Sequence, residues 1–232
     1  MELPAYWMTR PGSAPDGSTA AAFDALLADA VQNGPDRPID YRLDAPKWQF
    51  LCHAADRGEV VLHGSSAADI TRFEPRQSND IAEFGNRAAV YAAADGLWPM
   101  YFAILDRPRH RMSLCNSCMR VQRSDGSLTE PYYFFSVNNE VLDEWQFGPG
   151  TVYLLPAADF EREPPYRERG RQVHTAQAAC LRPVAPLAKL SVQPADFPFL
   201  HRIRGHDLQE QMTRIAADPD GFPWLDEPEP PR

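Results

Sequence analysis

The sequence has no long hydrophobic run. No stretch approaches the roughly 18 consecutive apolar residues of a membrane-spanning helix, and the first residues, MELPAYWMTRPGS, lack the charged-then-apolar order of a signal peptide. We therefore expect no membrane partner and a cytoplasmic location. The 232 residues include only four cysteines, too few for a disulfide scaffold at this length, and this fits reduced thiols in the cytosol.

A Lys/Arg-rich run is also missing. The formal net charge is −9, and acidic residues are spread along the chain. This argues against duplex nucleic acid bound through a basic face. Glycine is modest at 13 residues, whereas the 23 prolines are about twice the usual share. We expect the prolines to separate short strands, and we expect a flexible acidic, proline-rich tail at residues 218–232.

The common catalytic signatures are absent as well. The chain contains no phosphate-cradling GxxxxGK, no GxGxxG, no GxSxG and no HExxH. The CNSC segment, Cys115 to Cys118, has metal-ligand or redox spacing, but no second CxxC or HxxxH completes a four-ligand zinc site. Structural thiols are the favoured interpretation of this pair, and a metal or redox function is the alternative.

Hydrophobic periodicity and turn residues predict four helices and about six strands. The helices are expected at residues 18–33, 46–57, 96–105 and 207–217, the first with Ser18 or Thr19 as N-cap. The strands are expected at residues 59–63, around Tyr91, and at 112–123, 131–137, 151–156 and 186–192. The charged segment EREPPYRERGRQ, residues 161–172, is predicted to be a solvated loop.

Only one predicted helix lies between predicted strands, so alternating βαβ winding fits poorly. Strands grouped apart from helices indicate an α+β fold. The composition, 44% hydrophobic and 24% charged, suits a soluble globular protein with a sizeable core. We expect an N-terminal helical extension at residues 1–57, an α+β domain at residues 58–217, and the tail.

The stretch EVVLHGSS carries the most specific functional signal. His63 ends a predicted strand, Gly64 permits close approach of a ligand to the backbone, and Ser65 offers a hydroxyl. Downstream, Tyr91 lies in a second apolar strand and Tyr101 on the helix that follows. Taken singly, a histidine after a strand or a tyrosine in an apolar run is usually a packing residue. The order and spacing together favour a binding site.

Three segments resemble the first two motifs of the ADP-ribosyltransferase fold. They are LHGSS, then FEPR at residues 73–76, then AVYAAADGLWPMYFAI at residues 89–104. The resemblance covers about residues 59–105. It implies a split antiparallel sheet of about six strands, preceded by the helical extension, and NAD as the bound substrate.

The resemblance also implies roles in a nicotinamide pocket. His63 would donate to a ribose hydroxyl and the Gly64 backbone would meet the carboxamide, beside Ser65. Tyr91 and Tyr101 would hold the flat ring between them, as aromatic faces favour a ring that is positively charged before cleavage. Arg76 would meet the pyrophosphate, since a guanidinium fork matches phosphate oxygens.

The third motif of that family is where the chain departs from the pattern. The family places a carboxylate at the start of a later strand, but RQVHTAQAACLRPV contains no acid. Gln177 or Gln172 is the expected substitute. A neutral amide can hold the ribose hydroxyl but stabilises developing positive charge less well. Other candidates for the place are His174 and the earlier Glu140, Glu144 and Glu161.

The predicted function is therefore that of an ADP-ribosyltransferase-type protein. It would bind NAD, cleave the nicotinamide–ribose bond and pass ADP-ribose to water or to an unknown acceptor. The alternative is a catalytically inactive nucleotide- or partner-binding module on the same fold.

Overall fold

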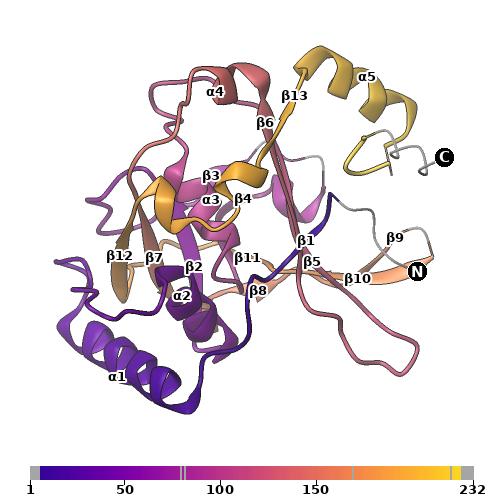
Figure 1. Ribbon diagram of the computed structural model, residues 1–232. Coiled ribbons are helices and arrows are strands. Elements are labelled where there is room, and N and C mark those ends of the chain that lie inside the picture. Colours follow the sequence, from indigo (N-terminus) through magenta and orange to yellow (C-terminus); the bar gives the residue numbers. More distant parts are fainter. Residues whose placement is uncertain (1–5, 79, 81, 169, 220, 226–232) are drawn as a thin grey trace.

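The computed structural model describes residues 6–78, 80, 82–168, 170–219 and 221–225. Figure 1 shows an α+β fold, which confirms the predicted class. The helices are α1 (Gly17–Asn33), α2 (Lys47–Asp56), α3 (Trp98–Ile104), α4 (Asn139–Asp143) and α5 (Leu208–Ala217). Among the described residues no helix is long and apolar enough to cross a membrane.

One seven-stranded sheet holds the segments that carry the motifs. Its order is β12-β7-β2-β4-β11-β8, and β3 pairs with β4. Its neighbouring strands run antiparallel. The strands are β2 (Val60–Ser65), β3 (Arg76–Gln77), β4 (Ala88–Ala93), β7 (Gly150–Pro156), β8 (Glu161–Arg162), β11 (Gln177–Cys180) and β12 (Ala188–Val192).

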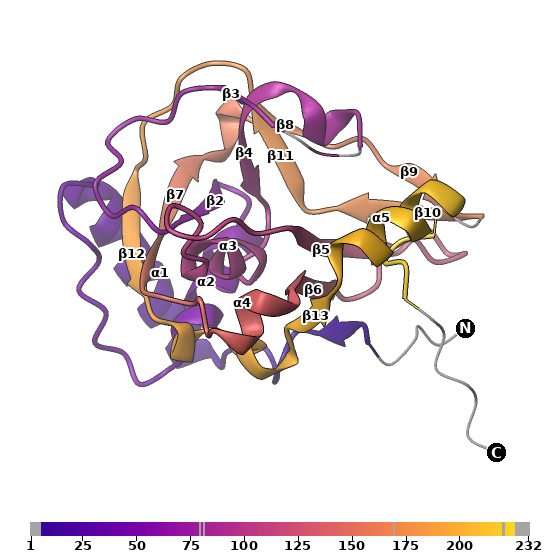
Figure 2. The ribbon, with the colours of Figure 1, turned by 90° about the horizontal axis from the view of Figure 1, so that it is seen from above.

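The second sheet has six strands in the order β1-β6-β5-β10-β9, with β13 parallel to β6. The strands are β1 (Met8–Thr9), β5 (Leu114–Val121), β6 (Tyr132–Asn138), β9 (Tyr166–Glu168), β10 (Arg171–Thr175) and β13 (Arg204–His206). Figure 2 shows this sheet extending away from the part of the molecule that holds α1, α2, β12 and β7.

The larger number of strands comes partly from residues 161–172, where the prediction of a loop is wrong. This segment contributes β8, β9 and the start of β10. Strands β9 and β10 form an antiparallel pair, and Gly170 has a φ of +78° between them. A glycine in the left-handed region makes such a tight connection possible. The sequence of β8 and β9 lacks the apolar alternation of a typical strand, because both strands lie at a sheet edge and are largely exposed.

The four predicted helices are confirmed, with one correction at a helix start. Asp16, and not Ser18 or Thr19, caps α1: its carboxylate accepts a hydrogen bond from the Thr19 N–H at 2.7 Å. An aspartate is among the strongest N-cap residues because its oxygen satisfies an N–H that lacks a partner within the helix. Gly58 follows the end of α2, with a φ of +78°.

Helices α1 and α2 share an apolar core with both sheets. Phe23 of α1 and Phe50 of α2 belong to the same buried cluster as Leu62 of β2, Leu154 of β7 and Phe135 of β6. The expected extension at residues 1–57 therefore packs directly against the expected α+β domain. A smaller buried cluster lies on the opposite face of the seven-stranded sheet. Its members include Val61, Phe73, Val90, Tyr153, Leu155, Ala178 and Val184.

Helix α3 lies in direct backbone contact with β2. A Cβ atom added at Gly64 would stand 1.8 Å from the carbonyl oxygen of Pro99 and 2.8 Å from the amide nitrogen of Ala103. No larger residue fits there without moving the helix. Gly64 thus serves packing in this fold, whatever else its backbone does.

We expect Gly64→Ala to lower the free energy of unfolding by about 1–3 kcal/mol or more, because overpacking a rigid backbone contact forces local displacement. Gly148→Ala is the matched control, since an added Cβ there meets nothing within 4 Å. It should change stability by no more than about 0.5 kcal/mol. Urea unfolding followed by circular dichroism measures both. Equal stability of the two variants would contradict the packing described here.

Candidate functional site

His63 lies on β2 with its imidazole largely buried. Its Nδ1 is 2.6 Å from the backbone carbonyl oxygen of Tyr91, and its ring packs on Phe73 at a centroid distance of 4.6 Å. A carbonyl oxygen only accepts, so Nδ1 carries the proton. Burial lowers the pKa of His63, the bond to Tyr91 opposes this shift, and the charge of Arg107 adds to it. The imidazole is therefore neutral at physiological pH, with a free lone pair on Nε2.

This hydrogen bond spans a place where β2 and β4 are no longer paired in the seven-stranded sheet, and we call this place the opening between β2 and β4. The ladder between β2 and β4 contains a single pair, Leu62 with Ala93. From His63 onward, the β4-facing edge of β2 is outside that ladder, although β2 stays paired with β7 through Gly64 and Ser65. The Ser65 hydroxyl oxygen accepts from the Ala67 N–H at 3.2 Å. His63, Gly64 and Ser65 are therefore the residues of β2 that lie beyond its last pair with β4.

Tyr91 meets His63 through its backbone and not through its ring. Its hydroxyl accepts from the Arg87 N–H at 2.8 Å and donates to the Phe84 carbonyl at 2.9 Å. These bonds anchor the turn that precedes β4. The tyrosine is half-buried, and it belongs to neither apolar cluster.

Tyr101, by contrast, lies in the main core. Its relative exposure is 0%, its hydroxyl donates to the Ser136 carbonyl at 2.9 Å, and its ring lies 4.8 Å from that of Phe135. Burial also raises its pKa well above the ordinary range. Among the described residues no ring contact joins Tyr101 to Tyr91. The structure does not bring these two rings together as a sandwich.

The remaining predicted residues lie on three different strands. Arg76 is exposed on β3, which pairs with the start of β4 at Ala89. Gln177 begins β11 and pairs with Ala93 of β4, so it lies in the same sheet as His63. Gln172 is on β10 of the other sheet and is exposed to solvent. Of the two glutamines, only Gln177 shares the sheet of the histidine.

Glu163 is an acid near this sheet that no sequence motif singles out. Its N–H donates to the Gln177 carbonyl at 3.0 Å, which continues the pairing of β8 with β11. Directly opposed residues of antiparallel strands share a face, so Glu163 and Gln177 lie on the face of Tyr91. The Glu163 carboxylate accepts a bond from the Thr175 hydroxyl. Burial raises the pKa of Glu163, and that hydrogen bond partly opposes the rise.

Glu163 is nevertheless remote from His63. Three strand spacings separate β8 from β2, which corresponds to roughly 14 Å. The two side chains cannot hold the same ribose hydroxyl across that distance. The positive charge of Arg107 contributes to lowering the pKa of His63. Among the described residues no ion pair joins His63 to a carboxylate.

Cys115 and Cys118 occupy β5 as the sequence predicted for a strand. Side chains three apart on a strand point to opposite faces, so the pair cannot grip one ion. All four cysteines are free and buried, and burial raises the pKa of Cys115 to about 12. Within the described ranges no three potential ligands gather into a metal site. The structural interpretation of these thiols agrees with this arrangement.

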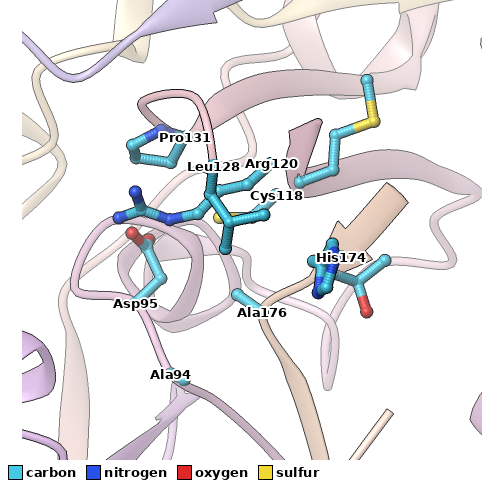
Figure 3. A pocket seen from close by; sticks show the side chains of 10 residues that line it. Ala94, Asp95, Cys118, Arg120, Leu128, Pro131, His174 and Ala176 are labelled. Carbon is cyan, nitrogen blue, oxygen red and sulfur yellow. The ribbon is translucent and has the colours of Figure 1, made fainter. Parts of the chain in front are cut away.

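A small cavity lies where the two sheets meet (Figure 3). Its volume is about 160 Å³, below the 300–1,000 Å³ range of pockets for drug-sized ligands. The lining residues are Ala94, Asp95, Cys118, Met119, Arg120, Leu128, Pro131, His174, Thr175 and Ala176. His174, a possible substitute for the missing acid, thus faces this cavity and lies in the other sheet from His63.

The buried acid of this cavity is Asp95, and both of its carboxylate oxygens accept hydrogen bonds from other residues of the protein. One carboxylate oxygen accepts from the N–H groups of Leu97 and Trp98, both at 2.8 Å, at the start of α3. The other accepts from the Tyr133 hydroxyl at 2.6 Å and from Arg10 at 3.5 Å. With its acceptors used in this way, Asp95 holds α3 in place and has little capacity left for a ligand.

Comparisons with known proteins found no matching family model, no matching curated protein and no matching solved structure.

The titration of His63 leads to a testable pH dependence. Because its pKa is lower in the folded than in the unfolded chain, protons bind the unfolded state more readily as the pH falls below about 6.5. The contribution of His63 to stability is thus complete above that pH and is lost between there and its folded pKa. We expect His63→Asn, which can still donate to the Tyr91 carbonyl, to flatten the dependence of unfolding free energy on pH between 7 and 5.

The exposed His201 provides the control. His201→Asn should leave the slope of unfolding free energy against pH as in the wild type, measured by urea unfolding at each pH. An unchanged slope in His63→Asn would show that the imidazole is not held neutral by the fold.

Proposed function

We propose that the protein binds NAD at the opening between β2 and β4. The observation that carries this proposal is the 2.6 Å contact between His63 Nδ1 and the Tyr91 carbonyl, just beyond the last ladder pair of these strands. It joins the two motifs whose resemblance to ADP-ribosyltransferases suggested a nicotinamide pocket. The pocket would be entered along the unpaired edge of β2.

The hydrogen-bond chemistry of His63 defines its role in this proposal. Since Nδ1–H is committed to Tyr91 and the ring is neutral, Nε2 accepts a hydrogen bond from a ribose hydroxyl. This is the reverse of the donation expected from the sequence. Beside it, the backbone of Gly64 on the open edge offers polar groups to the carboxamide of nicotinamide.

The Tyr91 ring lies on the face of β4 opposite to Val90 and Ala92, with its hydroxyl already bound to the backbone of residues 84 and 87. Such anchoring limits motion of the ring, so little conformational entropy is lost when a flat ligand stacks on it. The proposal does not depend on Tyr101, which serves the core.

Binding is favoured over transfer because of the charges at His63. Cleavage of the nicotinamide–ribose bond develops positive charge on the sugar, and a nearby carboxylate stabilises that charge. Here the charge acting on the imidazole comes from Arg107, and the polar side chain at the start of β11 is the neutral Gln177. We therefore propose a nucleotide-binding module of ADP-ribosyltransferase type whose rate of ADP-ribosyl transfer is low.

Transfer of ADP-ribose to water or to another acceptor is the second candidate function. The position of Glu163 favours it, because this acid shares a face of the sheet with Tyr91 and Gln177. Its raised pKa is typical of a carboxyl group held away from water. For catalysis, β8 and the ribose would have to approach one another.

Titration calorimetry with NAD tests the binding proposal. We expect saturable binding by the wild type and a dissociation constant about tenfold higher or more for His63→Asn, since loss of one hydrogen bond to the ligand costs about 1–2 kcal/mol. The control His201→Asn should bind as the wild type does. Absence of NAD binding at millimolar concentration, or equal affinity of both variants, would refute the proposal.

A nicotinamide-release assay separates the two candidate functions. The binding module should release nicotinamide slowly, and Glu163→Gln should leave that rate unchanged. Rapid release by the wild type that is abolished in Glu163→Gln would establish the transferase instead.

A further inference from the structure

A loop that follows α3 concentrates positive charge in an acidic chain. Residues 106–111 read DRPRHR and contain three arginines, whereas the whole chain has a net charge of −9. We call this segment the arginine loop. Arg107, Arg109 and Arg111 are all exposed. The alternation of these arginines with proline and histidine is why the segment does not appear as a basic run in the sequence.

The packing of α3 places the arginine loop beside the opening at His63. Near its end, α3 contacts both β2 and β7: an added Cβ at Gly150 would lie 1.8 Å from the Ala103 carbonyl oxygen and 3.0 Å from that of Ser65. The helix therefore ends next to the last residue of β2. A bridge between Leu105 and Phe147 then fixes the base of the loop against the segment that precedes β7.

The guanidinium groups of the loop are available to a ligand. Arg109 is 81% exposed and pairs with Asp106 at 3.3 Å, and exposed pairs of this kind are weak. In the part of the chain that the structure describes, neither Arg107 nor Arg111 forms an ion pair with a carboxylate. The positive charge of Arg107 also contributes to the lowered pKa of His63.

We propose that the arginine loop is a binding site for the phosphate groups of a ligand whose other end lies at His63. A planar guanidinium presents paired N–H donors that match phosphate oxygens, and three of them on one short loop suit a diphosphate or a phosphate ester. This inference rests on the proposed function for the identity of the ligand. Two sources share the chemistry: the diphosphate of NAD itself, or a phosphate group on an acceptor molecule.

Inorganic pyrophosphate is the direct probe, measured by titration calorimetry. The test variant is Arg107→Ala/Arg111→Ala, and the matched control is Arg42→Ala/Arg123→Ala, which removes the same charge from exposed sites between α1 and α2 and between β5 and β6. We expect the pyrophosphate dissociation constant to rise about tenfold or more in the loop variant. In the control it should change less than about twofold, because remote exposed charges are screened.

Since all four positions are exposed, the variants should fold, and circular dichroism checks this. Arg107→Lys/Arg111→Lys, which keeps the charge but loses the planar fork, should bind with intermediate affinity. Failure of the wild type to bind pyrophosphate, or equal loss in the loop and control variants, would overturn the proposal.

Nicotinamide riboside, which has no phosphate, separates this inference from the proposed function. If the riboside and NAD both fail to bind while pyrophosphate binding depends on the loop, the NAD proposal is wrong and the phosphate site stands. If NAD binds but neither NAD nor pyrophosphate responds to the loop variant, the phosphate site is wrong. A competition identifies the source: displacement of pyrophosphate by saturating NAD indicates the diphosphate of NAD, and simultaneous binding indicates a phosphate on an acceptor.

Discussion

The close packing of α3 on the seven-stranded sheet is the constraint on which the rest of the structure depends. Gly64 of β2 and Gly150 of β7 allow the helix backbone to contact both strands, as no side chain intervenes. The buried carboxylate of Asp95 holds the start of the helix through two N–H groups and is itself tied to Tyr133 of the second sheet. One short helix thereby connects the two sheets, and these contacts fix the positions of both of its ends.

This arrangement also places the candidate site. Helix α3 crosses β2 at Gly64, next to the point at which β2 and β4 stop pairing. The preceding residue, His63, lies at this point, and its imidazole contacts the Tyr91 carbonyl of β4. The arginine loop begins at the C-terminal end of α3, near the last residue of β2. A neutral hydrogen-bond acceptor at His63 and the exposed guanidinium groups of the arginine loop thus lie near the end of β2. These groups suit the hydroxyl and phosphate components of a nucleotide.

Much of the fold was predictable because local signals agreed with the tertiary structure. Helix α2 ends before Gly58, and β2 and β7 are continuous apolar runs because both of their faces are covered. Residues 161–172 escaped prediction because exposed edge strands need no apolar alternation. Their identity as strands depends on pairing: β9 pairs with β10, which follows it in the sequence, and β8 pairs with β11.

The site was predictable only in part, for a related reason. Motif spacing predicted a shared site for His63 and Tyr91, and in the structure the His63 imidazole contacts the Tyr91 backbone carbonyl. The spacing carried no information on which way a side chain points. Tyr101 belongs to the core because helix α3 turns that face toward Phe135. Glu163 went unnoticed because its place beside Gln177 arises from strand pairing and not from any motif. The positions and directions of these side chains therefore depend on contacts between neighbouring strands and helices, which short motifs do not encode.

A crystal structure of the protein soaked with NAD would show whether NAD binds at the opening between β2 and β4. We expect a ribose hydroxyl within hydrogen-bond distance of His63 Nε2, nicotinamide against Tyr91 and the unpaired edge of β2, and phosphate groups facing residues 106–111. Nicotinamide bound in the cavity beside Asp95, or an opening between β2 and β4 that remains free of ligand at saturating NAD, would contradict it.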